Sequence, residues 1–190
     1  MILKGNLVDL RTMTLRERPL FFRWATRSDA TPYWYGELYG DEVPSYVIFK
    51  LEWPNYYFDG TQPELGRCFM ILREGRPIGQ INYNKINSKD KSVELDILIA
   101  KQKDLGKGYG TDAIRTLTTY LFRAMDVRRC RIEVLAKNPR AVRAYEKAGF
   151  SHSYAYTREN IEWRVMEMMA DAFPERKLVI VNDLMEGEKR

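Results

Sequence analysis

Short stretches of alternating apolar and polar residues recur along the chain, and this alternation is typical of strands that bury one face. It predicts strands over residues 6–11, 67–73, 78–83, 92–100, 131–135, 150–156 and 162–169. The sequence Glu74-Gly75-Arg76-Pro77 separates the second strand from the third and is typical of a tight turn. We therefore expect the three strands between residues 67 and 100 to form a meander.

Other segments carry apolar residues three or four positions apart, which is the spacing of an amphipathic helix. The pattern predicts helices over residues 14–27, 45–56, 108–125 and 138–148. The last helix has clear boundaries, because Asn138 suits an N-cap, Pro139 suits the first turn and Gly149 follows the end. A meander followed by alternating strands and helices predicts an α/β fold in which helices cover a mixed sheet.

The chain has 190 residues, which is enough for one domain with its own core. We expect a single domain over residues 1–170 and a C-terminal extension over residues 171–190. A hydrophobic content of 45% and an aromatic content of 13% exclude a disordered chain. No apolar run approaches the roughly 18 residues of a membrane span, and the N-terminus lacks the apolar segment of a signal peptide. We therefore expect a cytoplasmic protein without a membrane partner.

Side chains that bind metals or form disulfides are few. The chain contains two cysteines, Cys68 and Cys130, and one histidine, His152. Both cysteines lie in predicted strands and are expected to be buried free thiols. A structural zinc site needs about four Cys or His ligands, so we expect no metal site. No Gly-x-Ser-x-Gly nucleophile elbow is present, which argues against most hydrolase chemistry.

The net charge of +5 hides an acidic segment, residues 28–66, which contains seven acidic residues and one basic residue. This segment carries a charge of −6 and leaves +11 on the rest of the chain. It also contains ten aromatic residues. One part of the chain therefore suits a cation, and the rest suits an anion such as a phosphate-bearing cofactor or nucleic acid. The alternative for the acidic segment is a solvated surface over an aromatic core.

A glycine-rich segment, Lys103-Asp-Leu-Gly-Lys-Gly-Tyr-Gly-Thr111, lies between a predicted strand and a predicted helix. Glycines at alternate positions let the backbone approach a ligand, and the start of a helix offers free N–H groups that bind phosphate. One alternative is a loop that only turns a corner. Another is a dinucleotide-binding fold, although that fold normally opens with its glycine motif rather than with a meander.

Two carboxylates, Glu94 and Asp96, share one face of a strand whose other face is apolar. A strand this apolar is expected near the centre of the sheet. Burial of a carboxylate there costs free energy unless the carboxylate is paired or has a role in function. Burial and mutual repulsion would raise at least one pKa toward the range of a general base. The alternative is a pair that faces solvent or forms salt bridges.

The helix predicted over residues 138–148 has one large residue, Tyr145, on a face of small residues. The small residues are Ala141, Ala144 and Ala148. The Tyr145 hydroxyl is therefore a candidate for a position in a cleft, and a tyrosine that only packs is the alternative.

These segments, in this order and spacing over residues 92–150, resemble the GCN5-related N-acetyltransferase (GNAT) family. The resemblance implies a mostly antiparallel sheet that is splayed in the middle and has helices on both faces. It implies acetyl-CoA as the cofactor and Tyr145 as the group that protonates the departing thiolate. The implied cofactor contacts are Leu98, Ile99, Lys103, Gly106, Lys107, Gly108, Tyr109, Gly110, Thr111 and Asn138. The loop position that usually holds Arg or Gln in this family is Leu105 here.

Within the family, the glycine-rich loop and the run from Arg140 to Phe150 resemble the aminoglycoside 6′-N-acetyltransferase branch. Asp96 then matches an active-site aspartate, and Trp34-Tyr35-Gly36 matches an aromatic–glycine pair after the first helix. Glu133 stands where this branch often has an aspartate followed by proline, and no proline follows it here.

The resulting hypothesis is acetyl transfer from acetyl-CoA to a primary amine of a cationic small molecule such as an aminoglycoside. Asp96, or alternatively Glu94, would take the ammonium proton, and Tyr145 would act as general acid. The residues expected on the acceptor side are Trp34, Tyr35, Glu94 and Glu133.

Three alternatives stay open: an acetyltransferase for protein or peptide amines, a basic nucleic-acid-binding module, and a family member that binds acetyl-CoA without activity. Because the aromatic residues accompany the acids rather than the bases, we expect no nucleic-acid partner. We expect a monomer or a homodimer.

Overall fold

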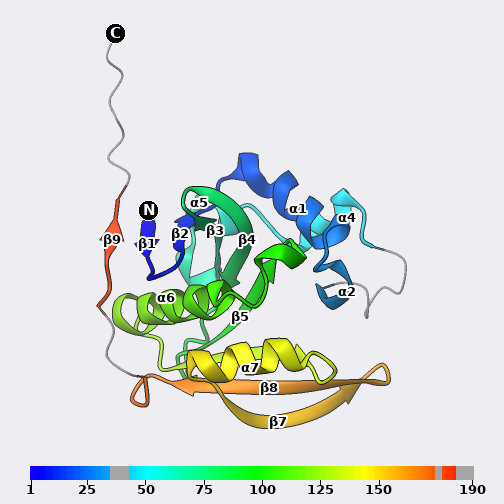
Figure 1. Ribbon diagram of the computed structural model, residues 1–190. Coiled ribbons are helices and arrows are strands. Elements are labelled where there is room, and N and C mark those ends of the chain that lie inside the picture. The colour runs from blue at the N-terminus through cyan, green and yellow to red at the C-terminus, as the bar shows by residue number, and fades with distance from the viewer. Residues whose placement is uncertain (35–42, 174–176, 183–190) are drawn as a thin grey trace.

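The computed structural model describes residues 1–34, 43–173 and 177–182, over which the strands form one nine-stranded sheet. The order in the sheet is β7-β8-β6-β5-β4-β3-β2-β1-β9 (Figure 1). The strands are β1 (Ile2–Lys4), β2 (Asp9–Thr12), β3 (Arg67–Arg73), β4 (Arg76–Tyr83), β5 (Ser92–Ile99), β6 (Arg129–Leu135), β7 (Ser151–Arg158), β8 (Ile161–Met169) and β9 (Ile180–Val181). Within this described part, β5 and β6 run parallel, and the other neighbouring strands pair antiparallel.

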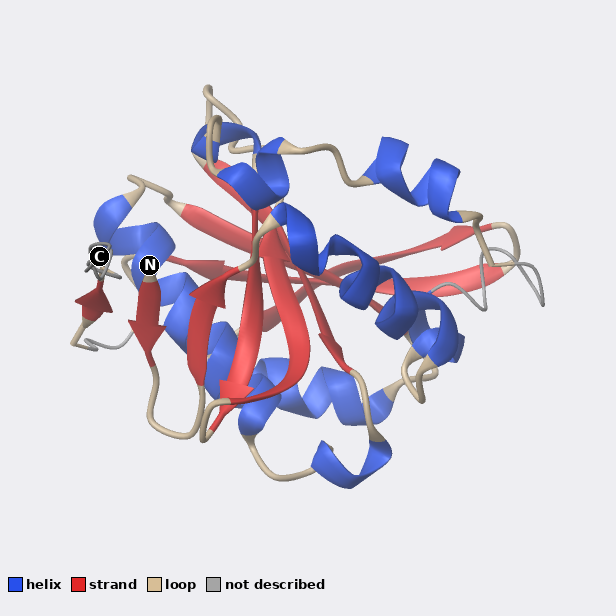
Figure 2. Cartoon of the chain, turned by 90° about the horizontal axis from the view of Figure 1, so that it is seen from above, coloured by secondary structure: helices blue, strands red, loops and turns tan. Residues whose placement is uncertain are grey.

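Helices pack on both faces of the sheet (Figures 1 and 2). They are α1 (Arg18–Arg27), α2 (Thr31–Trp34), α4 (Tyr46–Glu52), α5 (Tyr56–Asp59), α6 (Tyr109–Ala124) and α7 (Pro139–Ala148). Short 3-10 turns cover Leu15–Glu17, Pro63–Leu65 and Gln102–Asp104. The predicted fold class, a mixed and mostly antiparallel sheet with helices on both faces, is confirmed.

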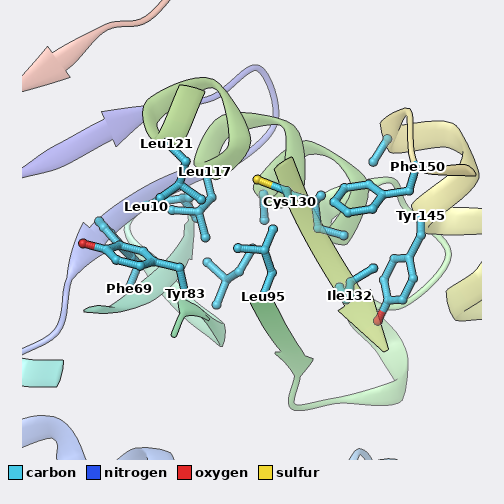
Figure 3. Close-up of a cluster of buried hydrophobic side chains, with 14 of the residues drawn as sticks. Leu10, Phe69, Tyr83, Leu95, Leu117, Leu121, Cys130, Ile132, Tyr145 and Phe150 are labelled. Atoms are coloured by element: carbon cyan, nitrogen blue, oxygen red, sulfur yellow. The ribbon is translucent and has the colours of Figure 1, made fainter. Parts of the chain in front are cut away.

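Two buried clusters, one on each face, hold these layers together. Alternate residues of β3 point to opposite clusters, Phe69 toward α6 and Met70 toward α1 and α4. The first cluster fills the space between α6, α7 and the sheet, and includes Leu117 and Tyr145 (Figure 3). The second cluster contains buried aromatic residues of the acidic segment, among them Phe49, so an aromatic core lies under part of that segment, although Tyr33 is 47% exposed.

The sheet opens between its two parallel strands. β5 pairs with β6 only over Ser92–Leu95, opposite Arg129–Ile132. Beyond that point β5 continues along β4 as far as Ile99, while β6 continues along β8 as far as Leu135. Beyond Leu95 and Ile132, β5 therefore pairs only with β4 among the described strands, and β6 pairs only with β8. This separation of β5 from β6 confirms the splay expected in the middle of the sheet.

The longest helix, α6, follows the predicted apolar spacing. Ala113, Leu117 and Leu121 recur every four residues and are fully buried. The helix begins after Gly108, whose φ of 84° lies in the left-handed region, and Asp126 beyond its end has a φ of 53°. The α7 boundaries are also confirmed, because Asn138 caps this helix by accepting a hydrogen bond from the Ala141 N–H at 3.2 Å.

The strand predicted over residues 6–11 is confirmed only from Asp9 onward, because residues 5–8 form the turn of a β1–β2 hairpin. A Cβ on Gly5 would lie 2.2 Å from the Val8 carbonyl oxygen, so the chain can turn tightly here only with glycine. The Asp112 carboxylate of α6 accepts the N–H groups of Leu7 at 2.7 Å and Val8 at 3.1 Å. These amides therefore find their partner in a helix more than 100 residues away.

Two further boundaries differ from the sequence prediction. The helix predicted over residues 45–56 is divided into α4 and α5, because Pro54 disfavours a helical conformation at Trp53 before it. After residue 170, β9 pairs with β1 at the edge of the sheet, so part of the predicted C-terminal extension joins the main sheet.

Cys68 and Cys130 are confirmed as buried free thiols. Burial raises the pKa of each thiol, which keeps both in the unreactive protonated form. Along residues 1–34, 43–173 and 177–182, the helices are too short or too polar to cross a bilayer, and three or more His, Cys, Asp or Glu side chains do not gather into a metal-binding group.

Candidate active site

A cavity of about 650 Å³ lies at the splay between β5 and β6. Its walls come from the second half of β5, the glycine-rich loop, the start of α6, the end of β6, α7 and α2. The predicted site residues that line it are Trp34, Glu94, Asp96, Leu98, Ile99, Gly106, Gly108, Tyr109, Gly110, Thr111, Glu133, Asn138 and Tyr145. Lys103 and Lys107 are exposed on the loop and do not line the cavity. Tyr35 lies outside the described residues.

The glycine-rich loop lines part of the cavity with Gly106, Gly108 and Gly110. Gly106 and Gly108 both have positive φ angles, 74° and 84°, and a Cβ on Gly106 would meet nothing within 4 Å. The first amides of a helix have no acceptor within the helix, and Gly108 offers α6 no side-chain cap. An open loop that ends in an uncapped helix start fits a diphosphate group, since both the amides and the helix dipole favour an anion.

Side chains near the loop support the same assignment. The one buried acid in the loop, Asp104, is paired with Arg76 at 2.8 Å, and this guanidinium lowers the pKa of Asp104 and offsets its charge. The Tyr109 ring is buried beneath the Arg73 guanidinium at 4.9 Å, so Tyr109 can reach a ligand through its main chain. An anion bound at this loop would therefore be held mainly by the loop backbone.

Asp96 lies at the start of the splay and is held by amide side chains rather than by a cation. Its Oδ2 atom accepts hydrogen bonds from Asn82 Nδ2 and Asn84 Nδ2, each at 3.0 Å. Asn84 is itself fixed, because its Oδ1 atom accepts the Tyr57 hydroxyl at 2.9 Å. Desolvation raises the pKa of Asp96, although the two amide hydrogen bonds lower it, so the carboxylate is poised to take up a proton.

Glu94 forms a salt bridge, which is the alternative to a general base that the sequence analysis left open. Its Oε2 atom lies 3.2 Å from Arg131 Nη2, and the same guanidinium also pairs with Glu133 Oε1. Desolvation, together with the charges of Asp96 and Glu133, raises the pKa of Glu94 to about 7. The Tyr156 hydroxyl donates to Glu133 Oε2 at 2.5 Å, so both Glu133 oxygens are engaged. Of the two predicted bases, Asp96 is the one that forms no ion pair among the described residues.

Tyr145 reaches the cavity from α7. Its side chain is 8% exposed and lies at one end of the buried cluster, beside Ile132 (Figure 3). Burial, and secondarily the charge of Asp96, raises the pKa of the Tyr145 hydroxyl, which therefore stays protonated and able to donate. The α7 helix is held against α6 by the Thr111 hydroxyl, which donates to the Ala144 carbonyl at 3.2 Å.

Aromatic side chains from α2 and β8 form a further wall of the cavity. Tyr33, Trp34 and Trp163 line the cavity, and the Trp34 ring packs edge-on against Phe21 of the second cluster at 5.9 Å. The Arg140 guanidinium lies 6.0 Å from the Tyr33 ring and links α7 to α2. This wall adds flat apolar surface beside the carboxylates.

The sequence analysis missed Asn82, Asn84, Tyr57 and Arg131. A signal was present for the asparagines: Asn82 on β4 and Asn84 directly after it are two positions apart, as Glu94 and Asp96 are on β5. Their meeting depends on the antiparallel register, which places Asn82 opposite Asp96. Arg131 faces Glu94 through the parallel register of β5 and β6, and no local pattern in the sequence indicates that pairing.

Comparisons with known proteins agree with this geometry. The family model for the acetyltransferase (GNAT) domain matches residues 8–151. An aminoglycoside N(6′)-acetyltransferase type 1 of Klebsiella pneumoniae is 29% identical over 163 residues, which is 80% of this chain and 78% of that protein.

Two solved structures show the same fold. The structure of AAC(6′)-Ib in complex with paromomycin and acetyl-CoA aligns with a TM-score of 0.70 at 25% identity, over 88% of this chain and 96% of that one. A spermidine N-acetyltransferase from Vibrio cholerae, in complex with CoA and spermine, aligns with a TM-score of 0.72 at 20% identity, over 87% of this chain and 97% of that one. With the splayed sheet and the open loop, these matches show that the chain belongs to the GNAT family and is an acetyl-CoA-dependent N-acetyltransferase.

Proposed function

We propose that this enzyme acetylates a primary amine of a polycationic small molecule of the aminoglycoside class. The observation that carries the proposal is the gathering of Glu94, Asp96 and Glu133 in one cavity beside the aromatic wall. Carboxylates attract ammonium groups, and aromatic rings pack against the flat faces of sugars. The similarity to an aminoglycoside acetyltransferase over most of both chains supports the same acceptor class.

The cofactor end of the cavity holds acetyl-CoA through main-chain groups. The amides from Gly106 to Thr111 hold the diphosphate, and the inner edge of β5 at Leu98 and Ile99 holds the pantetheine arm, since β6 has left that edge. Asn138 adds its side-chain amide nitrogen, because its oxygen already caps α7. Bound acetyl-CoA supplies the acetyl group as a thioester.

Asp96 removes the proton that blocks the reaction. An ammonium group has no lone pair, so the acceptor nitrogen must lose a proton before it can form a bond to the acetyl carbon. Asp96 takes this proton at its carboxylate, directly or through water, and the raised pKa makes the transfer easier than it would be to an exposed aspartate. As the C–N bond forms and the C–S bond breaks, Tyr145 donates its hydroxyl proton to the departing sulfur, and the second proton released by the acceptor nitrogen restores the hydroxyl.

The test is an assay of thiol release from acetyl-CoA with kanamycin, spermine and a peptide that has a free N-terminus. We expect turnover with kanamycin and a higher minimum inhibitory concentration of kanamycin for a susceptible bacterium that expresses the enzyme. Asp96→Asn should lower kcat by a factor on the order of 100 or more and leave acetyl-CoA binding intact. The matched control is Asp9→Asn, which changes an acid on β2 that is paired with Lys4 outside the cavity.

Three results would contradict parts of this proposal. Turnover of the peptide alone would assign the enzyme to protein amines, and turnover of spermine alone would assign it to polyamines. Wild-type kcat in Asp96→Asn would place the base elsewhere in the cavity.

A further inference from the structure

Arg131 lies next to the proposed acceptor end of the cavity, where it contacts two of the lining carboxylates. It stands behind Glu94 and Glu133, which line the cavity, while Arg131 itself does not. Its Nη2 atom pairs with both carboxylates, and its Nη1 atom donates to the Tyr154 hydroxyl at 3.4 Å. The guanidinium is thus held by groups from β5, β6 and β7 at once.

Charged side chains of both signs line the cavity. Three carboxylates, on Glu94, Asp96 and Glu133, face the cavity near the splay. Of the cations, Arg131 contacts two of these acids directly, whereas Arg158 lines the cavity with its guanidinium 5.0 Å from the Trp163 ring. Removal of Arg131 would therefore leave two carboxylates without their direct counter-ion.

We propose that Arg131 sets the charge selectivity of the acceptor site. By pairing with Glu94 and Glu133 it offsets part of the negative charge there, and so limits the affinity gained from each additional ammonium group on an acceptor. This inference rests on the proposed function, because it concerns amine acceptors bound at that end. Without Arg131, the site would favour highly charged acceptors more strongly over singly charged ones.

The test compares binding of amino sugars that carry rising numbers of ammonium groups: glucosamine, kanamycin and neomycin. Their dissociation constants are measured by calorimetry with the intact protein, at pH 8 and low ionic strength. In Arg131→Met, the ratio of the glucosamine Kd to the neomycin Kd should rise by a factor on the order of ten. The rise should shrink as salt is added, because salt screens the charges.

Two variants separate charge from packing. Arg131→Lys keeps the cation, and its ratio should stay close to that of the wild type. Arg129→Met removes an arginine two residues earlier on the same strand, where it pairs with Asp90 at 2.7 Å outside the cavity, and it should also keep the wild-type ratio. The melting temperature of each variant shows that it is folded under the assay conditions.

The outcomes distinguish this inference from the proposed function. An unchanged ratio in Arg131→Met, or an equal change in Arg129→Met or Arg131→Lys, would overturn the role of Arg131. Changed binding ratios without any acetylation of amino sugars would overturn the proposed acceptor class and leave the role of Arg131 standing. Absence of measurable binding of all three ligands would overturn both.

Discussion

One of the hydrogen bonds to Asp96 can be removed by a single substitution, which also removes the 3.0 Å bond from Asn82 Nδ2 to Asn84 Oδ1. Asn82 is fully buried on β4 and donates from Nδ2 to Asp96 Oδ2, while its own Oδ1 atom is buried without a partner among the described residues. Asn82→Leu removes one of the two donors to the carboxylate at nearly constant volume. It also removes an unsatisfied buried carbonyl, so we expect little loss of stability.

The magnitude follows from the worth of a hydrogen bond to a charged group, about 1.5–3 kcal/mol. The two amides lower the pKa of Asp96, so loss of one raises it and favours the protonated carboxyl. The protonation equilibrium should shift by a factor on the order of ten or more. Since only the deprotonated form can act as a base, the acidic limb of kcat/KM moves to higher pH, and the alkaline plateau changes little.

The measurement is kcat/KM against pH for wild type, Asn82→Leu and Gln80→Leu. Gln80 is the matched control, because it is a fully buried amide on the same face of β4 and its side chain makes no hydrogen bond within the described residues. On the acidic limb we expect roughly a tenfold lower kcat/KM for Asn82→Leu alone. A loss that is the same at every pH, or the same in Gln80→Leu, would refute Asp96 as the base held by these amides.

Three further predictions concern Tyr145, Glu94 and Leu117. Tyr145→Phe should lower kcat by a factor on the order of 100 while calorimetry finds an unchanged Kd for acetyl-CoA. An unchanged kcat would mean that another acid protonates the departing sulfur. The folded-state pKa of Glu94, about 7, lies above its ordinary value of 4.5, so wild-type stability falls as pH rises through this window. Glu94→Gln cannot ionise, and its melting temperature relative to wild type should therefore increase from pH 5 to pH 8, whereas a constant difference would contradict the raised pKa. Leu117→Ala, at a fully buried position of α6, should lower the free energy of unfolding in urea by about 2–5 kcal/mol, and a change below about 1 kcal/mol would contradict its place in the core.

The elements that could be predicted from the sequence are those whose signal is local. The apolar stripe of α6 and the caps of α7 lie within one helix each, and β3 was predicted with the bounds Arg67–Arg73 that the structure has. The glycine-rich loop is similar, because the spacing of its glycines and the following helix are both contiguous in the chain.

The features that could not be predicted depend on contacts between distant segments. The β1–β2 turn near Gly5 is held by Asp112 from α6, whereas the local pattern shows apolar Leu7, Val8 and Leu10 and suggests a strand. The choice between Glu94 and Asp96 likewise depends on which residues the neighbouring strands place opposite them. Arg131 reaches Glu94 from β6, and Asn82 reaches Asp96 from β4, by registers that the sequence does not reveal.

The two ends of the cavity use different kinds of groups, main-chain amides at one end and side chains at the other. The fold therefore constrains the choice of cofactor more strongly than the choice of acceptor amine. At the proposed cofactor end the groups are main-chain amides around Gly106 and Gly108, whose positions follow from the backbone path itself. At the acceptor end the groups are side chains on β5 and β6, and a strand keeps its hydrogen bonds whichever side chain projects from it. Membership of the GNAT family therefore carries the use of acetyl-CoA, whereas the choice of amine depends on a few substitutable residues. If that division is right, Arg131→Met should change the preference among amines and leave the affinity for acetyl-CoA as it is.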